Sequence, residues 1–112
     1  MPLKDYDLDH VFSNLVRDGD GNAVMSAWKR GQRLDVEVGA NYRAMVIYAP
    51  SAPPRPADGG SRGDFVCLEP MAGITNSMNL AHRGLYDDLQ YIPPGGTWQE
   101  SFRIRPSQRD KG

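Results

Sequence analysis

The sequence predicts an all-β fold, an antiparallel β-sandwich, and three observations support this prediction. Twelve Gly and nine Pro residues occur among the 112 residues, which indicates many turns. Apolar and polar residues alternate with period two in several segments rich in β-branched and aromatic side chains. No segment shows the periodicity of a long amphipathic helix. We therefore expect about seven short strands and no helix longer than about two turns.

Size, charge and cysteine content limit the classes of function. A chain of 12.4 kDa is expected to form a single domain over residues 1–112. Thirteen Lys and Arg residues nearly balance 14 Asp and Glu residues, so neither nucleic acid nor a membrane is expected as the main partner. The single cysteine, Cys67, excludes an internal disulfide, and His10 and His82 lack a metal-binding spacing. Without a long apolar segment or an apolar leader, the expected location is cytoplasmic.

The first third of the chain alternates strongly and is expected to begin with a hairpin. Residues 10–16 and 23–29 are predicted strands, and RDGDGN at residues 17–22 supplies Asp and Gly for a tight turn between them. A calcium-binding loop is the competing interpretation of RDGDGN, but its glycine comes too early and its flanks are strands. Residues 33–38 form the next predicted strand, with apolar side chains on one face and charged side chains on the other.

The middle of the chain combines the most apolar segment with the most irregular one. Residues 42–49 are apolar on both faces apart from one arginine, so this strand is expected inside a sheet or between sheets. Residues 50–63 contain four Pro and three Gly in 14 positions and are expected to form a surface loop. A domain linker is the competing interpretation, but the segments on either side are short for separate domains.

Two further strands are expected in the second half of the chain. Residues 64–69 form the first, and Pro70 is expected to end it because proline cannot donate to the strand ladder. A long stretch with little pattern follows. Residues 97–104 form the last predicted strand, and the polar tail at residues 106–112 is expected to fray.

Glu69 is the most informative charged residue. Phe65, Cys67 and Glu69 share one strand face, so a carboxylate follows two apolar side chains just before Pro70. Apolar surroundings disfavour the ionised form and would raise the pKa toward the range of a general base. The plainer interpretation is that the strand simply reaches solvent at Glu69. Glu100, between two aromatic residues, is interpreted as a structural carboxylate that is either paired or exposed at an edge.

Five segments carry a resemblance that extends along most of the chain. They are DLDHVFSNL, YRAMVIYAP, CLEP, TNSMN and PPGGTWQESFRI. In this order they resemble the C-terminal third of the aldose 1-epimerase (galactose mutarotase) family. The resemblance implies that the β-sandwich is part of a galactose-mutarotase-like supersandwich. It further implies an isomerase that acts on a monosaccharide without a cofactor or a metal ion.

The resemblance also implies roles for two residues. In the family, a glutamate removes the O1 proton of a cyclic sugar while a histidine protonates the ring oxygen, so that the ring opens and recloses as either anomer. The match at CLEP implies that Glu69 is the base, and the match at DLDHVFSNL implies that Asp9 contacts a sugar hydroxyl. The family's acid histidine lies upstream of the matching segment, and neither His10 nor His82 matches it. The resemblance therefore implies an incomplete site in this chain.

Three functions follow from these observations: an aldose 1-epimerase-like isomerase completed by another chain, a non-catalytic carbohydrate-binding module, and an assembly module that reuses the same surface. Because residues 42–49 are apolar on both faces, a monomer of this size is expected to leave one face uncovered. We therefore expect a homo-oligomer, most simply a dimer, or a complementary chain. The alternative is a compact monomer in which residues 50–63 and the tail cover the sheet.

Overall fold

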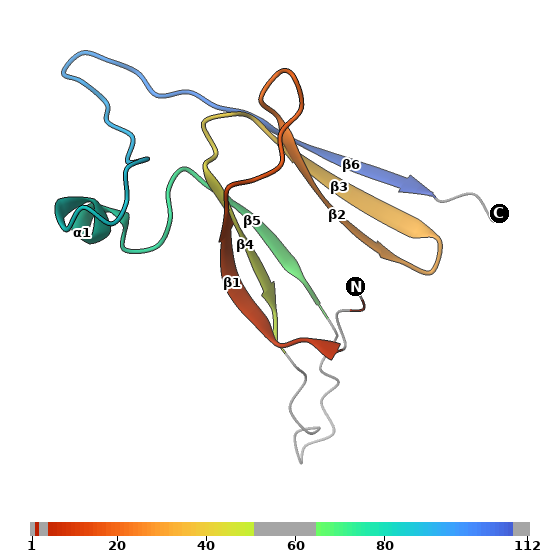
Figure 1. The fold of residues 1–112 in the computed structure, drawn as a ribbon. Helices are drawn as coiled ribbons and strands as arrows, with labels where there is room; N and C mark the ends of the chain where they lie inside the picture. Colours follow the sequence, from red (N-terminus) through yellow and green to blue (C-terminus); the bar gives the residue numbers. More distant parts are fainter. Residues whose placement is uncertain (1, 3–4, 51–64, 109–112) are drawn as a thin grey trace, which may run out of the picture.

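The described part of the chain folds into two three-stranded antiparallel sheets that form a sandwich-like structure (Figure 1). The computed structural model describes residues 2, 5–50 and 65–108. Sheet A has the strand order β1-β4-β5, and sheet B has the order β2-β3-β6. The elements are β1 (Leu8–Ser13), β2 (Ala23–Lys29), β3 (Gln32–Val38), β4 (Ala44–Ala49), β5 (Cys67–Met71), α1 (Ser77–His82) and β6 (Phe102–Gln108). The predicted all-β fold is confirmed.

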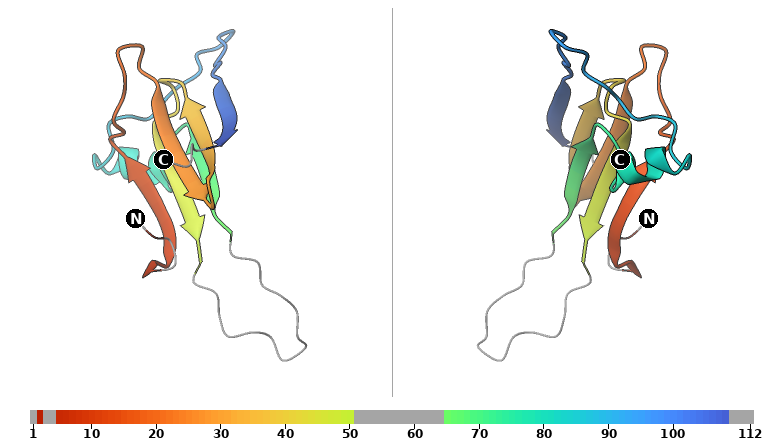
Figure 2. Two further views of the ribbon diagram at one scale, coloured as in Figure 1. Left: turned by 90° about the vertical axis from the view of Figure 1, so that its right-hand side faces the viewer. Right: turned by 90° about the vertical axis from the view of Figure 1, so that its left-hand side faces the viewer.

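The core lies between the inner faces of the two sheets, whose strands overlie one another in the views of Figure 2. Ala23 of β2 and Val36 and Val38 of β3 cluster with Met45 of β4, and Leu68 of β5 packs against this cluster. Val38 and Met45 are 0% and 1% exposed. Residues two apart on a strand point to the same side, so the alternation in the sequence delivers one apolar face from each sheet.

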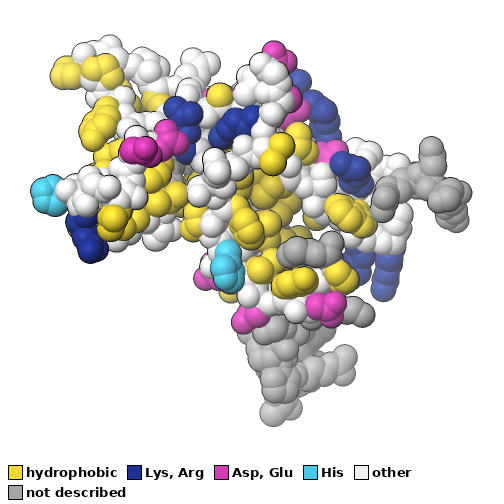
Figure 3. Space-filling view, in the orientation of Figure 1, with side chains coloured by type: hydrophobic (Ala, Val, Ile, Leu, Met, Phe, Trp, Pro, Cys, Tyr) yellow, Lys and Arg dark blue, Asp and Glu magenta, His cyan; other side chains and the backbone are white. Residues whose placement is uncertain are grey.

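The inner face of sheet B extends beyond the part that is covered. Leu34, Phe102 and Ile104 share this face with the core valines of β3, yet all three are exposed. In the space-filling view, hydrophobic side chains remain visible on the surface over both sheets (Figure 3). The core is therefore concentrated near the ends of β2 and β3 where sheet A packs.

β4 is the central strand of sheet A, as its apolar sequence predicts. Ala44, Met45, Val46 and Ala49 are all buried, although neighbouring residues of a strand point to opposite faces. The expectation that one copy of the chain leaves one face of residues 42–49 uncovered is therefore wrong for most of the strand. β1 and β5 flank β4 on both edges, so neither edge of this strand is open.

The hairpin predicted for residues 10–29 is wrong, because β1 and β2 belong to different sheets. β1 pairs with β4, with Leu8 opposite Ala49. β2 instead forms a hairpin with β3 through Arg30 and Gly31, whose φ angles are 51° and 78°. Positive φ at both central residues is typical of the two-residue turns that join antiparallel strands. The connection between β1 and β2 is long enough to carry the chain from one sheet to the other.

RDGDGN does form a tight turn, although this turn does not join paired strands. The Oδ1 atom of Asp18 accepts hydrogen bonds from the N–H groups of Asp20 and Asn22, both at 2.9 Å. The N–H of Asp18 in turn donates to the carbonyl of Asn22 at 2.9 Å. Gly21 has a φ of 84°, a conformation that glycine adopts without steric cost.

Two prolines lie inside edge strands, which corrects two predicted boundaries. Pro70 lies opposite Met45, and β5 continues to Met71, so Pro70 does not end the strand. Pro106 lies within β6, which begins at Phe102 and therefore starts and ends later than predicted. The first residues of the predicted tail are thus strand. An edge strand tolerates proline because the missing N–H can fall on its unpaired side.

The connection from β5 to β6 spans residues 72–101 and extends away from the sheets (Figure 1). It carries α1, a helix of six residues in a stretch for which no regular element was predicted, and its length agrees with the predicted limit of about two turns. No helix in the described ranges is long and apolar enough to cross a membrane. The loop predicted at residues 50–63 lies outside the described residues, except for Pro50.

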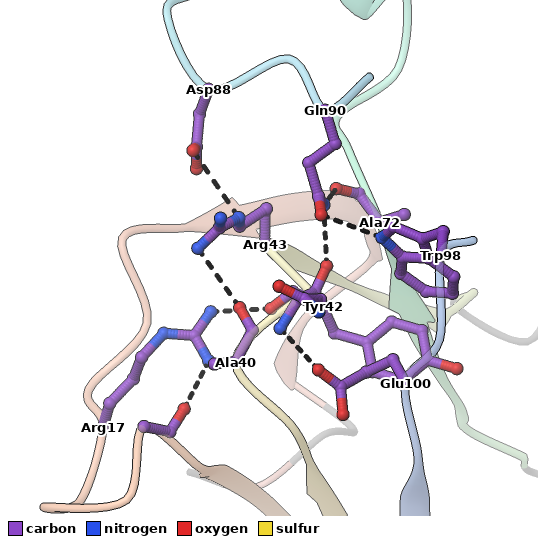
Figure 4. A network of polar contacts seen from close by, with 11 residues as sticks. Arg17, Ala40, Tyr42, Arg43, Ala72, Asp88, Gln90, Trp98 and Glu100 are labelled. Carbon is purple, nitrogen blue, oxygen red and sulfur yellow. Dashed lines mark hydrogen bonds and ion pairs between the residues drawn. The ribbon is translucent and has the colours of Figure 1, made fainter. Parts of the chain in front are cut away.

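A group of hydrogen bonds, named here the polar junction, ties this connection to the loops at the ends of the sheets (Figure 4). Its members are Arg17, Asn41, Gln90 and Glu100. The carboxylate of Glu100 accepts hydrogen bonds from the N–H groups of Asn41 at 2.7 Å and Ser101 at 2.8 Å. Arg17 donates to the carbonyl of Tyr42 at 2.6 Å. Glu100 is thus a paired structural carboxylate, one of the two alternatives expected for it.

Gln90 joins the two ends of the long connection to the β3–β4 loop. Its Nε2 atom donates to the carbonyls of Asn41 and Ala72, both at 2.7 Å. Its Oε1 atom accepts a hydrogen bond from the indole N–H of Trp98 at 2.9 Å. One amide side chain therefore connects the start of the connection, its end, and the loop between β3 and β4.

The hydrogen bonds at Glu100 lead to a prediction about stability. The N–H groups of Ser101 and then Asn41 hold the pKa of Glu100 below its ordinary 4.5. A carboxyl group with a lowered pKa stabilises the fold above its unfolded pKa, and this contribution is lost as the pH falls through the folded pKa. We predict that Glu100→Gln lowers the free energy of unfolding at neutral pH by about 1 kcal/mol, because a neutral amide replaces the charged carboxylate that accepts both hydrogen bonds.

Urea unfolding of the wild type and of Glu100→Gln measures this difference across the pH range. We expect the difference to shrink as the pH falls below the ordinary pKa of the carboxyl group, because the wild-type side chain is then protonated as well. A variant as stable as the wild type at neutral pH would contradict the structural role of Glu100.

Candidate functional site

The outer face of sheet A, which is turned away from sheet B, carries both residues that the sequence singled out. Asp9 on β1 lies opposite Tyr48 on β4, and Glu69 on β5 lies opposite Val46 on β4. Directly opposed residues share a face of the sheet, as do residues two apart on one strand, so all four belong to one face. Met45 lies one residue before Val46 and three residues before Tyr48 on β4, so its side chain points to the opposite face and into the core.

Asp9 and Glu69 lie on the two edge strands of sheet A, with β4 between them. β1 and β5 are two strand spacings apart, which is about 10 Å. Asp9 and Glu69 are also offset by two residues along the strands, which is about 7 Å. Their Cα atoms therefore lie roughly 12 Å apart. Glu69 faces Val11 across β4, and Asp9 lies two residues before Val11. The two carboxylates therefore border one surface over β4.

The surface between the carboxylates is apolar and partly aromatic. Val46 is buried beneath it, and Tyr48 and Cys67 are half-buried beside it. The rings of Tyr48 and Phe65 have their centroids 5.8 Å apart and are tilted by 58°. Phe65 is 54% exposed, so much of its ring remains accessible. An apolar and aromatic floor with a few polar groups at its margin is typical of small-molecule sites.

Both carboxylates are open to solvent. Asp9 and Glu69 are exposed, and within the described ranges neither side chain forms an ion pair. The plainer interpretation, that Glu69 reaches solvent, therefore describes this chain, although the cause is its place on an edge strand and not the end of that strand. The oxygen atoms of both side chains are available to donors on a ligand.

Neither histidine shares the outer face of sheet A. His10 follows Asp9 on β1 and so belongs to the opposite face, and its Nδ1 atom accepts a hydrogen bond from the N–H of Asp9 at 3.1 Å. His82 is the exposed last residue of α1.

A shallow depression of about 340 Å³ lies elsewhere, where the turn formed by RDGDGN meets β3 and β6. Its lining includes Asp18, Asp20, Glu37 and Arg103. Sequence reasoning missed it because these residues come from three separate segments that only the fold brings together. In the part of the chain that the structure describes, no group of three or more ligating side chains is arranged to hold a metal ion. Asp18 already uses one carboxylate oxygen to close its own turn.

Comparison of the chain with protein-family models, with curated proteins and with solved structures found no match. The likeness to aldose 1-epimerases therefore depends on the five sequence segments alone. The candidate site, by contrast, depends only on strand register and on the residues at each position.

Labelling of Cys67 tests the outer face directly, because this residue is the only thiol in the chain. Tyr48 lies directly opposite Cys67 on the same face, so its side chain is the cross-strand neighbour of the thiol. We predict that Tyr48→Ala raises the rate of maleimide labelling of the native protein severalfold, as measured by mass spectrometry. Tyr91→Ala, which removes an 80% exposed tyrosine from the β5–β6 connection, serves as the control and leaves the rate unchanged. Equal rates for all three proteins would contradict this arrangement.

Proposed function

We propose that the outer face of sheet A binds a free aldose and that Glu69 acts there as the base of an aldose 1-epimerase-like isomerase. The observation that carries the proposal is the shared face of Asp9 and Glu69 on either side of β4. The segments CLEP and DLDHVFSNL support it further, since they resemble the segments that hold the family's base and one of its sugar contacts.

Each part of the face has a role in holding a sugar ring. The apolar C–H side of a pyranose packs against Tyr48 and Phe65, whose rings form the aromatic part of the floor. The carboxylate of Asp9 accepts hydrogen bonds from sugar hydroxyls, and such bonds are strong because the acceptor is charged. Glu69, on the opposite edge of the sheet, takes the anomeric O1–H. Two carboxylates at the two margins then fix the orientation of the ring.

The proposed reaction needs one base and one acid. Glu69 accepts the O1 proton, the C1–O5 bond breaks, and its electron pair goes to O5, which is protonated by the acid. Rotation about the C1–C2 bond of the open aldehyde presents either face of the carbonyl to the O5 hydroxyl. Ring closure returns the proton from Glu69 to O1 and the O5 proton to the acid, so that atoms and charges balance.

The acid comes from another polypeptide in this proposal. His10 belongs to the opposite face of sheet A and is engaged with the backbone of Asp9. A second copy of the chain or a complementary chain, seated against the outer face, supplies the proton for O5. A reducing compartment such as the cytoplasm suits the protein in this proposal, because its single thiol stays free.

One observation favours a second candidate, a non-catalytic carbohydrate-binding module. Asp9 and Glu69 are both exposed, and the outer face of sheet A carries no histidine among its described residues. A face that has binding groups and a base but no acid retains a sugar without interconverting its anomers. This candidate requires no partner.

Polarimetry of freshly dissolved α-glucose separates the two candidates. We predict that the chain accelerates the approach to anomeric equilibrium when imidazolium in the buffer supplies the missing acid, and that Glu69→Gln abolishes this acceleration. Glu37→Gln is the matched control, because Glu37 is a strand carboxylate on sheet B that pairs with Arg105. Equal rates for the wild type and Glu69→Gln would remove Glu69 from the mechanism.

Titration calorimetry measures binding independently of turnover. We predict that Asp9→Asn weakens the binding of glucose about fivefold, because replacing a charge-assisted hydrogen bond by a neutral one loses about 1 kcal/mol. Binding without acceleration would identify the non-catalytic module. A wild-type chain that does not bind glucose or galactose would contradict both candidates.

A further inference from the structure

The four edge strands of the two sheets differ in how well they resist pairing with another chain. β5 and β6 each contain a proline, and β1 carries Asp9. Proline and charge are the devices by which natural sheets discourage such pairing. β2 (Ala23–Lys29) has neither until its last residue, and within the described ranges its only strand partner is β3 (Figure 1).

The hairpin turn determines which backbone groups of β2 point away from β3. Arg30 and Gly31 form the two-residue turn, so Lys29 and Gln32 close the hairpin as a hydrogen-bonded pair. Such pairs alternate along an antiparallel ladder, which makes Met25 a residue bonded to β3 and leaves the N–H and C=O groups of Ser26 directed to the open edge. The N–H and C=O groups of Val24 also point to the open edge. The edge is therefore ready to accept a strand.

We propose that β2 pairs antiparallel with β2 of a second copy of this chain, about a two-fold axis at Ser26. A two-fold axis perpendicular to the sheet keeps the same face of both copies on the same side. Because the axis passes through the strand pair at Ser26, Ser26 of one copy lies opposite Ser26 of the other. Val24 of each copy then lies opposite Trp28 of the other, and Met25 lies opposite Ala27. The result is a continuous six-stranded sheet with the order β6-β3-β2-β2-β3-β6.

The side chains of β2 are complementary to themselves in this register. Val24 and Trp28 are 51% and 55% exposed, and each dimer contains two such aromatic–aliphatic pairs, which are favourable cross-strand neighbours. Ser26 is small enough to meet its own copy at the axis. No like charges oppose each other, since Lys29 meets Ala23.

The other edge of sheet B shows the contrast. Two copies of β6 paired about Ile104 bring Arg103 of one copy opposite Arg105 of the other, which places like charges together twice. Pro106 also lacks the N–H that a pairing edge needs. The absence of opposed like charges and the complete set of backbone donors therefore both favour β2 over β6 as the edge that pairs with a second copy. This inference does not depend on the proposed sugar site, which lies on sheet A.

Disulfide trapping tests the register. Paired residues that exchange hydrogen bonds have Cα atoms about 5.5 Å apart, within the range that a disulfide spans. We expect Ser26→Cys to form a covalent dimer upon mild oxidation, well above the level of the wild type, whose only thiol is Cys67. Ser107→Cys, on the same face of sheet B but on the β6 edge, is the matched control and stays at the wild-type level. No excess of dimer for Ser26→Cys overturns the proposal.

Sedimentation equilibrium of the unmodified chain is a second test, because it measures whether the chain forms a dimer in solution. We expect a mass of twice 12.4 kDa at high micromolar concentration. Val24→Pro removes an N–H that the hairpin does not use, so it should leave a folded monomer with at least a tenfold weaker association. A single species near 12.4 kDa for the wild type overturns the proposal, as does a folded Val24→Pro variant that dimerises like the wild type. If Val24→Pro fails to fold by circular dichroism, the disulfide test decides.

Discussion

The register of β4 between β1 and β5 is the constraint on which the candidate site depends. In that register, Met45 and Leu68 turn inward to the core, while Val46, Tyr48 and Glu69 turn outward. A slip of one residue would exchange the two faces of a strand. It would place the carboxylate of Glu69 against the valines of sheet B and expose Leu68. Burial of an unpaired carboxylate is costly, so the packing of the core also fixes the residues of the outer face.

The polar junction performs a similar role for the loops. Tyr42 makes edge-to-face contacts with Trp98 and Phe102, with ring centroids 5.9 and 6.3 Å apart, and these contacts fasten the β3–β4 loop to the chain that enters β6. Glu100 and Gln90 supply the hydrogen bonds around these rings. The long β5–β6 connection is thus held at both ends, although several of its large apolar side chains remain exposed.

Local pattern predicted the strands better than it predicted their partners. Strands were expected at residues 23–29, 33–38 and 42–49, and β2, β3 and β4 lie there, with β4 starting two residues later than expected. Alternation and β-branched content are properties of a short segment, so they can be recognised locally. The pairing of β1 with β4 was not predictable in this way, because it depends on which apolar faces meet in the core. The hydrogen bonds of Glu100 to Asn41 and of Gln90 to Ala72 likewise join residues that are 59 and 18 positions apart. For the site, sequence reasoning singled out Glu69 and Asp9, but only the register shows that they share a face.

The most direct test of the central claim, that the outer face of sheet A receives an aldose, is the response of backbone amide resonances to added glucose. The account predicts shifts confined to β1, β4 and β5, largest at Asp9, Tyr48 and Glu69, with the resonances of sheet B unchanged. Shifts concentrated at Asp18 and Glu37, in the depression beside sheet B, or no shifts at all, would contradict it.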